Sequence, residues 1–291
     1  MTVGRAASIH ARLLNRARAR GEDFNLILTR YAIERFLYRL SLVPAREAFW
    51  LKGALLFDLW FDVPHRPTRD ADFLGFGPAD TEALASTMRE ICGVTVTVDD
   101  GMEFDPASIT IEEIREDSRY GGMRVRLLGR LGSARCNVQL DVGYGDAVTP
   151  GPEEAVYPTL LDDQPPPRLR VYPRAAVAAE KLEAIVNLGM ANSRMKDYFD
   201  LRALAREGVL DAQLLADAIA ATFQRRGTAL SMDVPLGLSD EFARDAAKRA
   251  QWKAFLDKNR LDAPALHEVV GEVRRFMTEP LKLARQSKGM S

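Results

Sequence analysis

Two aspartates separated by one residue, Asp70 and Asp72 in RDADF, are the side chains in this sequence that most clearly indicate chemistry. In a β-strand, residues i and i+2 point to the same face, so these carboxylates project together while Ala71 and Phe73 turn to the other face. Adjacent carboxylates repel each other at neutral pH, and a divalent cation relieves that repulsion. The pair therefore indicates a metal site, for Mg²⁺ or Mn²⁺.

A third acid, Asp141 in VQLDVGYGD, follows the same alternation in a later segment. Val138, Leu140 and Val142 share one face, and Asp141 lies on the other face. If the two strands are neighbours, three carboxylates converge on one site. The alternative is that an Asp-x-Asp pair in an acidic sequence marks a solvated strand edge or a turn.

A second group of charged residues lies on two predicted helices nearer the carboxyl end. Asp197 and Asp200 in SRMKDYFD are three residues apart and hence on one helix face, with Arg194 one turn earlier and Lys181 on the preceding helix. On composition alone we favour an ordinary charged surface helix for SRMKDYFD. The alternative is a second part of the functional site.

Composition places the chain among globular proteins. It has 291 residues, 47% hydrophobic and 28% charged, which predicts one or two domains with a real core. No apolar run reaches the roughly 18 residues of a membrane helix, and the start lacks a secretory signal, so we expect a cytoplasmic protein without membrane contact. Two cysteines and three scattered histidines argue against a disulfide framework and a zinc site.

Charge is distributed unevenly. Residues 1–50 hold nine basic and four acidic side chains, and residues 250–291 hold eight and five, while the net charge of the chain is −1. The centre is therefore acidic and both ends are basic, which suits a phosphate-rich partner such as RNA. Arg12, Arg16 and Arg20, spaced four apart, are the first RNA-binding candidates; the alternative is that each belongs to a solvated helix face.

Hydrophobic periodicity, together with glycine and proline residues that end helices and strands, predicts the secondary-structure elements. Three consecutive prolines at 165–167 mark the expected domain boundary, because proline donates no backbone hydrogen bond. We expect an α+β fold: a mixed sheet with flanking helices and a helical extension at the amino end over 1–164, then a mainly helical domain over 165–291. In the first domain we expect two opening helices, ending at Gly21 and before Pro44, and then a strand ending at Leu51 with a turn at Gly53 into a short helix. A strand within 66–77 and a helix over 80–93 follow, and then strands at 109–114, 123–128 and 136–142, with a hairpin turn at Gly132-Ser133. After the prolines we expect a short strand LRVY, a helix from Pro173 to about Leu188, and helices from Arg194 nearly to the end.

The order of these features resembles the nucleotidyltransferase fold, in which a glycine turn approaches the triphosphate, an acid pair holds magnesium, and a third acid assists. Ala54 departs from that pattern, since many members have glycine or serine there. With KGALLF, RPTRDADFLGFG and AEKLEAI…RMKDYFDL in this order, the sequence also resembles the AbiEii/AbiGii abortive-infection toxin family, which includes the MenT-type transfer-RNA nucleotidyltransferase toxins. The resemblance spans most of the chain.

The resemblance implies roles for individual residues. Lys52 and Gly53 occupy the glycine-turn motif, and Asp70 and Asp72 occupy the metal-binding positions. Asp141 stands at the position of the third acid, as a base or an additional metal ligand.

In the helical domain, Lys181 is the lysine expected to engage the triphosphate, and Asp200 is the essential acid of the last motif, with Arg194 and Asp197 beside it. This domain is thereby expected to contribute lysine and acid motifs to the active site.

Just ahead of the acid pair lie Arg66 and Thr68, whose places make them candidates for nucleotide binding. The Arg66 guanidinium is a candidate to reach phosphate; pairing with Asp70 or Asp62 is the alternative.

The activity implied is Mg²⁺-dependent transfer of a nucleoside monophosphate from an NTP, with release of pyrophosphate. The acceptor implied is the 3′ end of tRNA, whose modification blocks translation. The resemblance thus implies the toxin of a toxin-antitoxin or abortive-infection system, with a cognate antitoxin. Two alternatives remain open: a non-catalytic module that binds nucleotide and antitoxin, and a nucleotidyltransferase acting on a protein or a small molecule.

Overall fold

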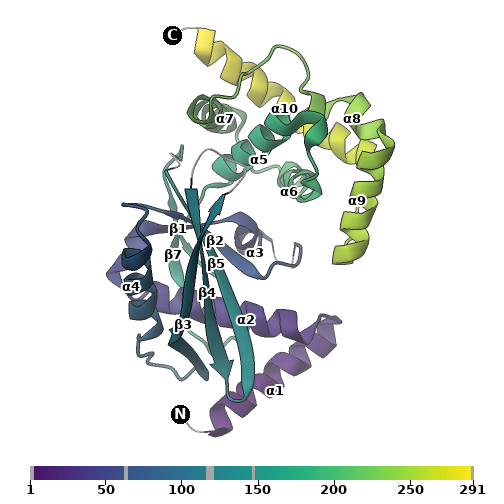
Figure 1. Ribbon diagram of the computed structural model, residues 1–291. Coiled ribbons are helices and arrows are strands. Elements are labelled where there is room, and N and C mark those ends of the chain that lie inside the picture. The colour runs from purple at the N-terminus through teal and green to yellow at the C-terminus, as the bar shows by residue number, and fades with distance from the viewer. Residues whose placement is uncertain (1–2, 62–64, 116–120, 146–147, 290–291) are drawn as a thin grey trace. The chain divides into compact units, whose positions relative to one another are not determined.

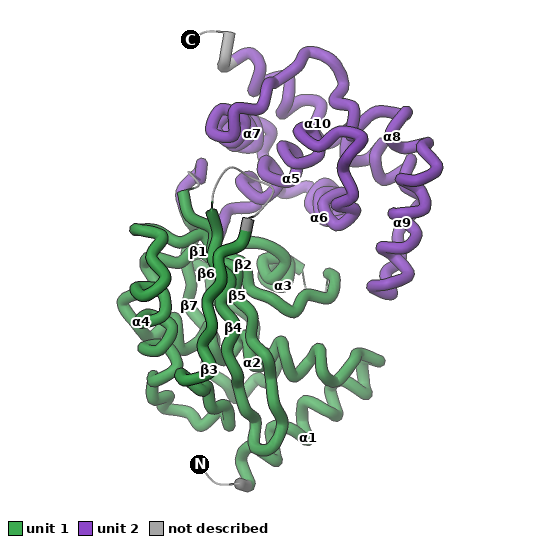
Figure 2. The backbone as a smooth tube through the Cα atoms, viewed as in Figure 1, with its two compact units in different colours: residues 1–146, 152–171 green, residues 147–151, 172–291 purple. Residues whose placement is uncertain are grey.

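The computed structural model describes residues 3–61, 65–115, 121–145 and 148–289, and the chain forms two compact units (Figure 1, Figure 2). The first unit comprises Met1–Asp146 and Pro152–Val171, and the second comprises Ala147–Gly151 and Tyr172–Ser291. The first is an α/β unit and the second is helical, which confirms the predicted fold class.

The first unit is built on one seven-stranded mixed sheet in the order β3-β4-β5-β2-β1-β7-β6. The pairs β2–β5 and β1–β7 are parallel, and the other neighbours are antiparallel. Its elements are α1 (Val3–Arg20), α2 (Phe24–Leu40), η1 (Pro44–Ala48), β1 (Phe49–Lys52), η2 (Gly53–Leu55), α3 (Leu56–Trp60), β2 (Asp70–Gly75), α4 (Thr81–Cys92), β3 (Met102–Arg115), β4 (Gly121–Leu131), β5 (Ala134–Tyr144), β6 (Glu153–Val156) and β7 (Arg168–Val171).

Alternating side chains give the sheet one apolar and one polar face. On β4 and β5, Val125, Leu127, Val138 and Leu140 are buried and share a face. Helices α1, α2 and α4 contact β4, β5 and β3 respectively, and α2 also contacts α4, so these helices cover the apolar face (Figure 1). The opposite face of β4 and β5 carries the polar residues, and it is the face on which the carboxylates lie.

The sheet extends beyond the expected end of the first domain. β7 pairs in parallel with β1, with Trp50 opposite Arg170 and Leu51 opposite Val171. The proline run at 165–167 therefore lies inside the first unit, which ends at Val171 rather than at residue 164. The physical reason is that the short strand after the prolines hydrogen-bonds to β1, which outweighs the break in periodicity.

The second unit is a cluster of helices. Its elements are α5 (Arg174–Leu188), η3 (Gly189–Ala191), α6 (Met195–Glu207), α7 (Ala212–Arg226), η4 (Leu236–Leu238), α8 (Asp240–Arg244), α9 (Ala246–Asn259) and α10 (Leu266–Gly289). Pro173 precedes α5, as the sequence predicts, and Ser239 caps α8 by accepting a hydrogen bond from the Phe242 amide. In the core, Tyr198 stacks on Phe242 at 5.2 Å between ring centroids.

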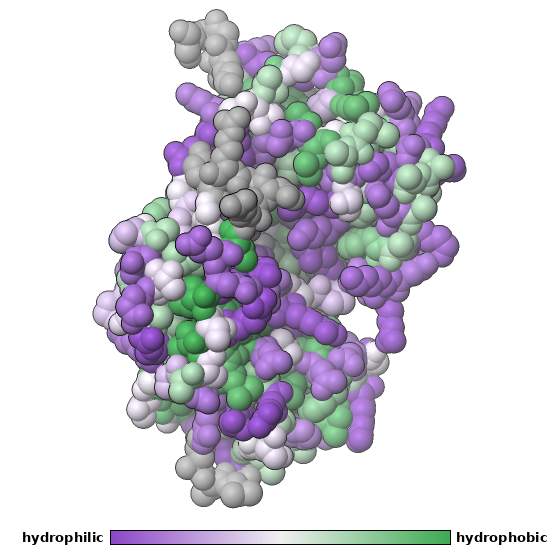
Figure 3. Space-filling view, viewed as in Figure 1, coloured by the Kyte–Doolittle hydropathy of each residue, from purple (hydrophilic) through white to green (hydrophobic). Residues whose placement is uncertain are grey.

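On the surface drawn in Figure 3, hydrophilic residues are spread over both units, and hydrophobic residues form small separate groups. Within the described ranges, every helix is too short or too polar to cross a membrane.

Candidate active site

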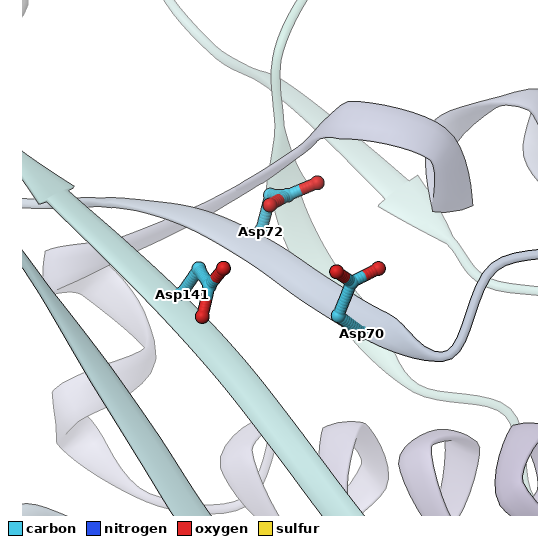
Figure 4. Close-up of side chains that lie close together, drawn as sticks. All are labelled: Asp70, Asp72 and Asp141. Atoms are coloured by element: carbon cyan, nitrogen blue, oxygen red, sulfur yellow. The ribbon is translucent and has the colours of Figure 1, made fainter. Parts of the chain in front are cut away.

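Three carboxylates lie together on the polar face of the first unit. Asp70 and Asp72 come from β2 and Asp141 from the neighbouring parallel strand β5, with Asp72 directly opposite Asp141. One oxygen of each lies within 4.8 Å of the others, and Figure 4 shows the three side chains projecting from adjacent strands. Asp70 and Asp72 are half-buried and Asp141 is buried. Carboxylate oxygens this close together suit a hard divalent cation such as Mg²⁺ or Mn²⁺.

Strand register places the acids in a row of charged residues across five strands. Lys52 on β1 lies opposite Asp72, Asp72 opposite Asp141, Asp141 opposite Arg124 on β4, and Arg124 opposite Glu112 on β3. Residues directly opposite each other share a face. The two central acids are therefore flanked by a lysine on one side and an arginine on the other.

Arg124 binds Asp141 through a bidentate pair. Its Nε donates to Oδ1 at 2.8 Å and its Nη2 donates to Oδ2 at 2.7 Å. These hydrogen bonds raise the pKa of the guanidinium above its usual range. Because both oxygens accept from one rigid fork, Asp141 is fixed in orientation beside the acid pair.

The glycine turn lies against the second acid of the pair. Gly53 has φ of 75°, and a Cβ there would lie 2.0 Å from Oδ2 of Asp72. Only glycine adopts this conformation without strain and leaves room for the carboxylate. Lys52 extends over the same face, since a Cβ at Gly143 would lie 3.5 Å from its Nζ.

The loop before β2 supports the first acid. The Thr68 hydroxyl donates to Oδ1 of Asp70 at 2.7 Å, so Thr68 orients a carboxylate of the triad. Arg66 is half-buried in the same loop, and Asp62, its alternative partner, lies outside the described residues.

In the second unit, Lys181, Asp197, Asp200 and Arg194 form one ion cluster. Lys181 Nζ donates to Asp197 Oδ1 at 2.9 Å and to Asp200 Oδ2 at 2.7 Å, and Arg194 Nε donates to Asp197 Oδ2 at 2.7 Å. Both carboxylates are 0% exposed. The interpretation of SRMKDYFD as a charged surface helix is therefore wrong for these two aspartates, because they face the protein interior.

The cluster holds Asp197 in the charged form. Burial pushes the pKa of Asp197 up, but Lys181 and Arg194 outweigh it, so the pKa lies below its ordinary value of 3.8. The loop before α6 is also anchored, because buried Lys248 donates to the Asn192 carbonyl at 2.9 Å. Two cations and two buried carboxylates are thus joined by three charged hydrogen bonds in this unit.

The arginines expected to bind RNA have internal contacts in the structure. Arg12 makes a bidentate pair with Asp163 at 2.9 and 2.6 Å, and Arg16 donates to the Leu160 carbonyl at 2.9 Å. Hydrogen bonding from Arg12 holds the pKa of Asp163 well below its usual range. Arg20 is 43% exposed and lies 4.0 Å from Glu22. Part of the charge at the amino end therefore ties α1 to the segment before the prolines.

Sequence reasoning missed Arg124 and Lys248. A usable signal existed for Arg124, because a two-residue turn at Gly132-Ser133 sets the hairpin register that pairs position 124 with 141. For Lys248 we find no signal in the sequence, since the contact that anchors the loop is to a backbone carbonyl 56 positions away.

A mixed sheet that carries three converging carboxylates beside a glycine turn defines the class: this is a nucleotidyltransferase. Residues 35–277 match the family described as the nucleotidyl transferase AbiEii toxin of type IV toxin-antitoxin systems, and the chain belongs to that family. Among proteins with curated functions, none is similar enough to count as a match.

One solved structure shows the same fold at a TM-score above 0.5. MenT4, a nucleotidyltransferase toxin from Mycobacterium tuberculosis, is 20% identical with a TM-score of 0.59, and the match covers 94% of this chain and 89% of that one. JHP933 from Helicobacter pylori is 15% identical with a TM-score of 0.49, over 91% of this chain and 96% of its own.

Proposed function

We propose that this toxin transfers a nucleoside monophosphate from an NTP to the 3′ end of tRNA, with Mg²⁺ as the divalent cation and release of pyrophosphate. The observation that carries the proposal is the convergence of Asp70, Asp72 and Asp141 within 4.8 Å on one face of the sheet. Modification of that end blocks aminoacylation, and a cognate antitoxin restrains the activity. NTPs and tRNA are cytoplasmic, and we place the protein there.

The residues of the first unit have distinct roles in this proposal. Asp70 and Asp72 hold the cation, which supplies charge neutralisation at the reacting phosphate when bound. The Thr68 hydroxyl orients Asp70, and the turn at Gly53 leaves room for the Asp72 carboxylate. Asp141 offers a third oxygen to the same site, and Arg124, which binds both oxygens of this carboxylate, offsets its negative charge.

The chemistry is an in-line displacement. The acceptor hydroxyl oxygen forms a bond to the α-phosphorus, the bond from that phosphorus to the β-phosphate oxygen breaks, and pyrophosphate leaves. Lys52, on the face of the acids, offsets charge on the phosphates. The hydroxyl proton passes to a carboxylate of the triad or to water.

For the second unit we keep the roles that the family resemblance gives. Lys181 engages the triphosphate, and Asp200 is the essential acid of the last motif, with Arg194 and Asp197 beside them. The exposure of the Arg194 side chain, 41%, supports contact with phosphate, whereas Lys181 is 12% exposed and already bound to two carboxylates. Lys181 therefore acts through the cluster that it holds together as well as through its charge.

The experiment is incubation with each α-labelled NTP, Mg²⁺ and total cellular RNA, followed by gels that separate RNA species from protein. The proposal predicts label on tRNA, with one NTP preferred, and no label with Asp70→Asn. Label on a protein or a small molecule contradicts the acceptor, and label on nothing favours the non-catalytic alternative.

A further inference from the structure

We propose that the acceptor enters as a single-stranded nucleic-acid end lying along β4 and β5, held by an arginine strip of Arg126, Arg130 and Arg135. The inference rests on the proposed function, since it deepens the account of the acceptor. It assigns nucleic-acid binding to a surface of the first unit that sequence reasoning did not select.

The strip is continuous with the acid triad. β4 and β5 pair without a register shift from Gly122 opposite Gly143 to Leu131 opposite Ala134. The face of Arg124 and Asp141 therefore continues with residues two, four and six positions away on each strand. The members of this face are Arg126, Leu128 and Arg130 on β4, and Gln139, Asn137 and Arg135 on β5.

Two of these arginines oppose each other without an acid between them. Arg130 lies directly opposite Arg135, and like charges in that position destabilise a sheet. In the part of the chain that the structure describes, neither makes an ion pair within 4.0 Å. Arg135 is exposed and Arg130 is half-buried. A polyanion laid across the pair removes the repulsion, which is why the arrangement points to phosphate.

Acidic groups bound the strip on one side. Glu112 on β3 pairs with Arg126 at 2.8 Å, and both side chains are about half exposed. Glu103 lies opposite Arg130, and Asp105 lies opposite Leu128 on the same edge strand. These acids on β3 repel phosphate, so the path that remains follows β4 and β5 toward the triad.

The dimensions and side chains fit a single strand. From Asp141 to Arg135 the strand spans about 20 Å, at about 3.4 Å per residue. That length takes several nucleotides of a stacked strand, at about 3.4 Å each. Guanidinium planes stack on bases, and Asn137 and Gln139 offer donors and acceptors to base edges. The 3′ hydroxyl then arrives at the acids while the preceding nucleotides lie on the sheet.

The test is RNA binding by the full chain without NTP or metal, so that it does not depend on catalysis. A fluorescein-labelled single-stranded RNA of about 12 nucleotides is titrated with wild type and with the Arg130→Gln, Arg135→Gln double variant, across a range of salt. The double variant is expected to bind the RNA at least about fivefold more weakly. The slope of the logarithm of the binding constant against the logarithm of the salt concentration should be smaller by about 1.4, because each lost phosphate contact lowers it by about 0.7.

The matched control is Arg89→Gln with Arg244→Gln, which removes the same charge from exposed positions on α4 and α8. It should bind as wild type. The strip variant should unfold at the same or a higher temperature, since a like-charge pair is lost. A strip variant with wild-type affinity and salt slope overturns the proposal, as does a wild type that does not bind the RNA; an acidic protein is then the partner to test.

Failure of this inference is distinguishable from failure of the proposed function. If tRNA is labelled but the strip variant binds RNA normally, only the arginine strip is wrong. If the strip variant loses RNA binding but no NTP labels RNA, RNA binding by the arginine strip is supported and the proposed transfer to RNA is wrong.

Discussion

Gly53 and Asp72 are in direct contact across the β1–β2 pair: a Cβ at position 53 would lie 2.0 Å from the Asp72 carboxylate oxygen. The turn after β1 therefore does more than reverse the chain. It fixes the carboxylate that lies opposite Asp141, so the geometry of the triad depends on a residue that contributes no side chain.

Replacing Gly53 with alanine should abolish nucleotide transfer by displacing Asp72, and should weaken Mn²⁺ binding measured by electron paramagnetic resonance. The free energy of unfolding should fall by about 1–3 kcal/mol from the positive φ and the clash. Gly21→Ala is the matched control, because Gly21 has φ of 65° with nothing within 4 Å of the added Cβ. Nucleotide transfer by Gly53→Ala at the wild-type rate would contradict the claim that the glycine turn positions Asp72.

Arg124→Met should bind Mn²⁺ about tenfold more tightly than wild type, because the triad then lacks an adjacent positive charge and Asp141 gains unoccupied lone pairs. Electron paramagnetic resonance of Mn²⁺ measures this directly. Arg126→Met, on the same strand and paired with exposed Glu112, is the control and should leave the affinity unchanged. Weaker Mn²⁺ binding by folded Arg124→Met would show that Asp141 depends on Arg124 to act as a ligand.

Lys181→Ala should lower the free energy of unfolding by about 3–5 kcal/mol, because it leaves two buried carboxylates without their shared cation. Lys181→Arg keeps the charge and should retain more stability and more transfer activity. Lys196→Ala, on the exposed side of α6, is the control for lysine loss and should have little effect. Chemical denaturation followed by circular dichroism measures all three, and equal stability of Lys181→Ala and Lys196→Ala would contradict the prediction.

The same cluster predicts a dependence on pH. The pKa of Asp197 is lowered in the folded state, so its contribution to stability is present above its unfolded value of 3.8 and is lost as pH falls through the folded pKa. Lys181→Ala removes a charge that lowers the pKa of Asp197 while the burial that raises it remains, so the Asp197 carboxyl should take up a proton at higher pH than in the wild type. The stability deficit of that variant should therefore shrink between pH 7 and about pH 5. A deficit that stays constant over this range would contradict the charge assignment.

Much of the first unit was predictable because its signals are local. Alternation predicted the strands around Asp70 and Asp141 and placed both acids on polar faces, and the parallel pairing of β2 with β5 then brings them together. The pairing of Arg124 with Asp141 also follows from a local signal, because the two-residue hairpin turn sets the register between β4 and β5.

The remaining features depend on contacts distant in sequence. Nothing local indicates that Asp197 and Asp200 face inward, because an i,i+3 charged pair looks the same on a surface helix. The partner of Arg12 is 151 positions away at Asp163, so the arginines of α1 could not be distinguished from a solvated face. The pairing of β7, the strand after the prolines, with β1 could not be predicted for the same reason, since β1 lies far upstream.

The central claim is nucleotidyl transfer at the acid triad, and the most direct measurement compares NTP labelled at the α-phosphate with NTP labelled at the γ-phosphate. The wild type, Mg²⁺ and total cellular RNA are incubated with each label, beside Asp70→Asn and Asp72→Asn. The account predicts that α-label becomes covalently attached to RNA, that γ-label is released as pyrophosphate, and that neither variant transfers label while both stay folded. Transfer of γ-label to an acceptor, or α-label transfer by either variant at the wild-type rate, would contradict it.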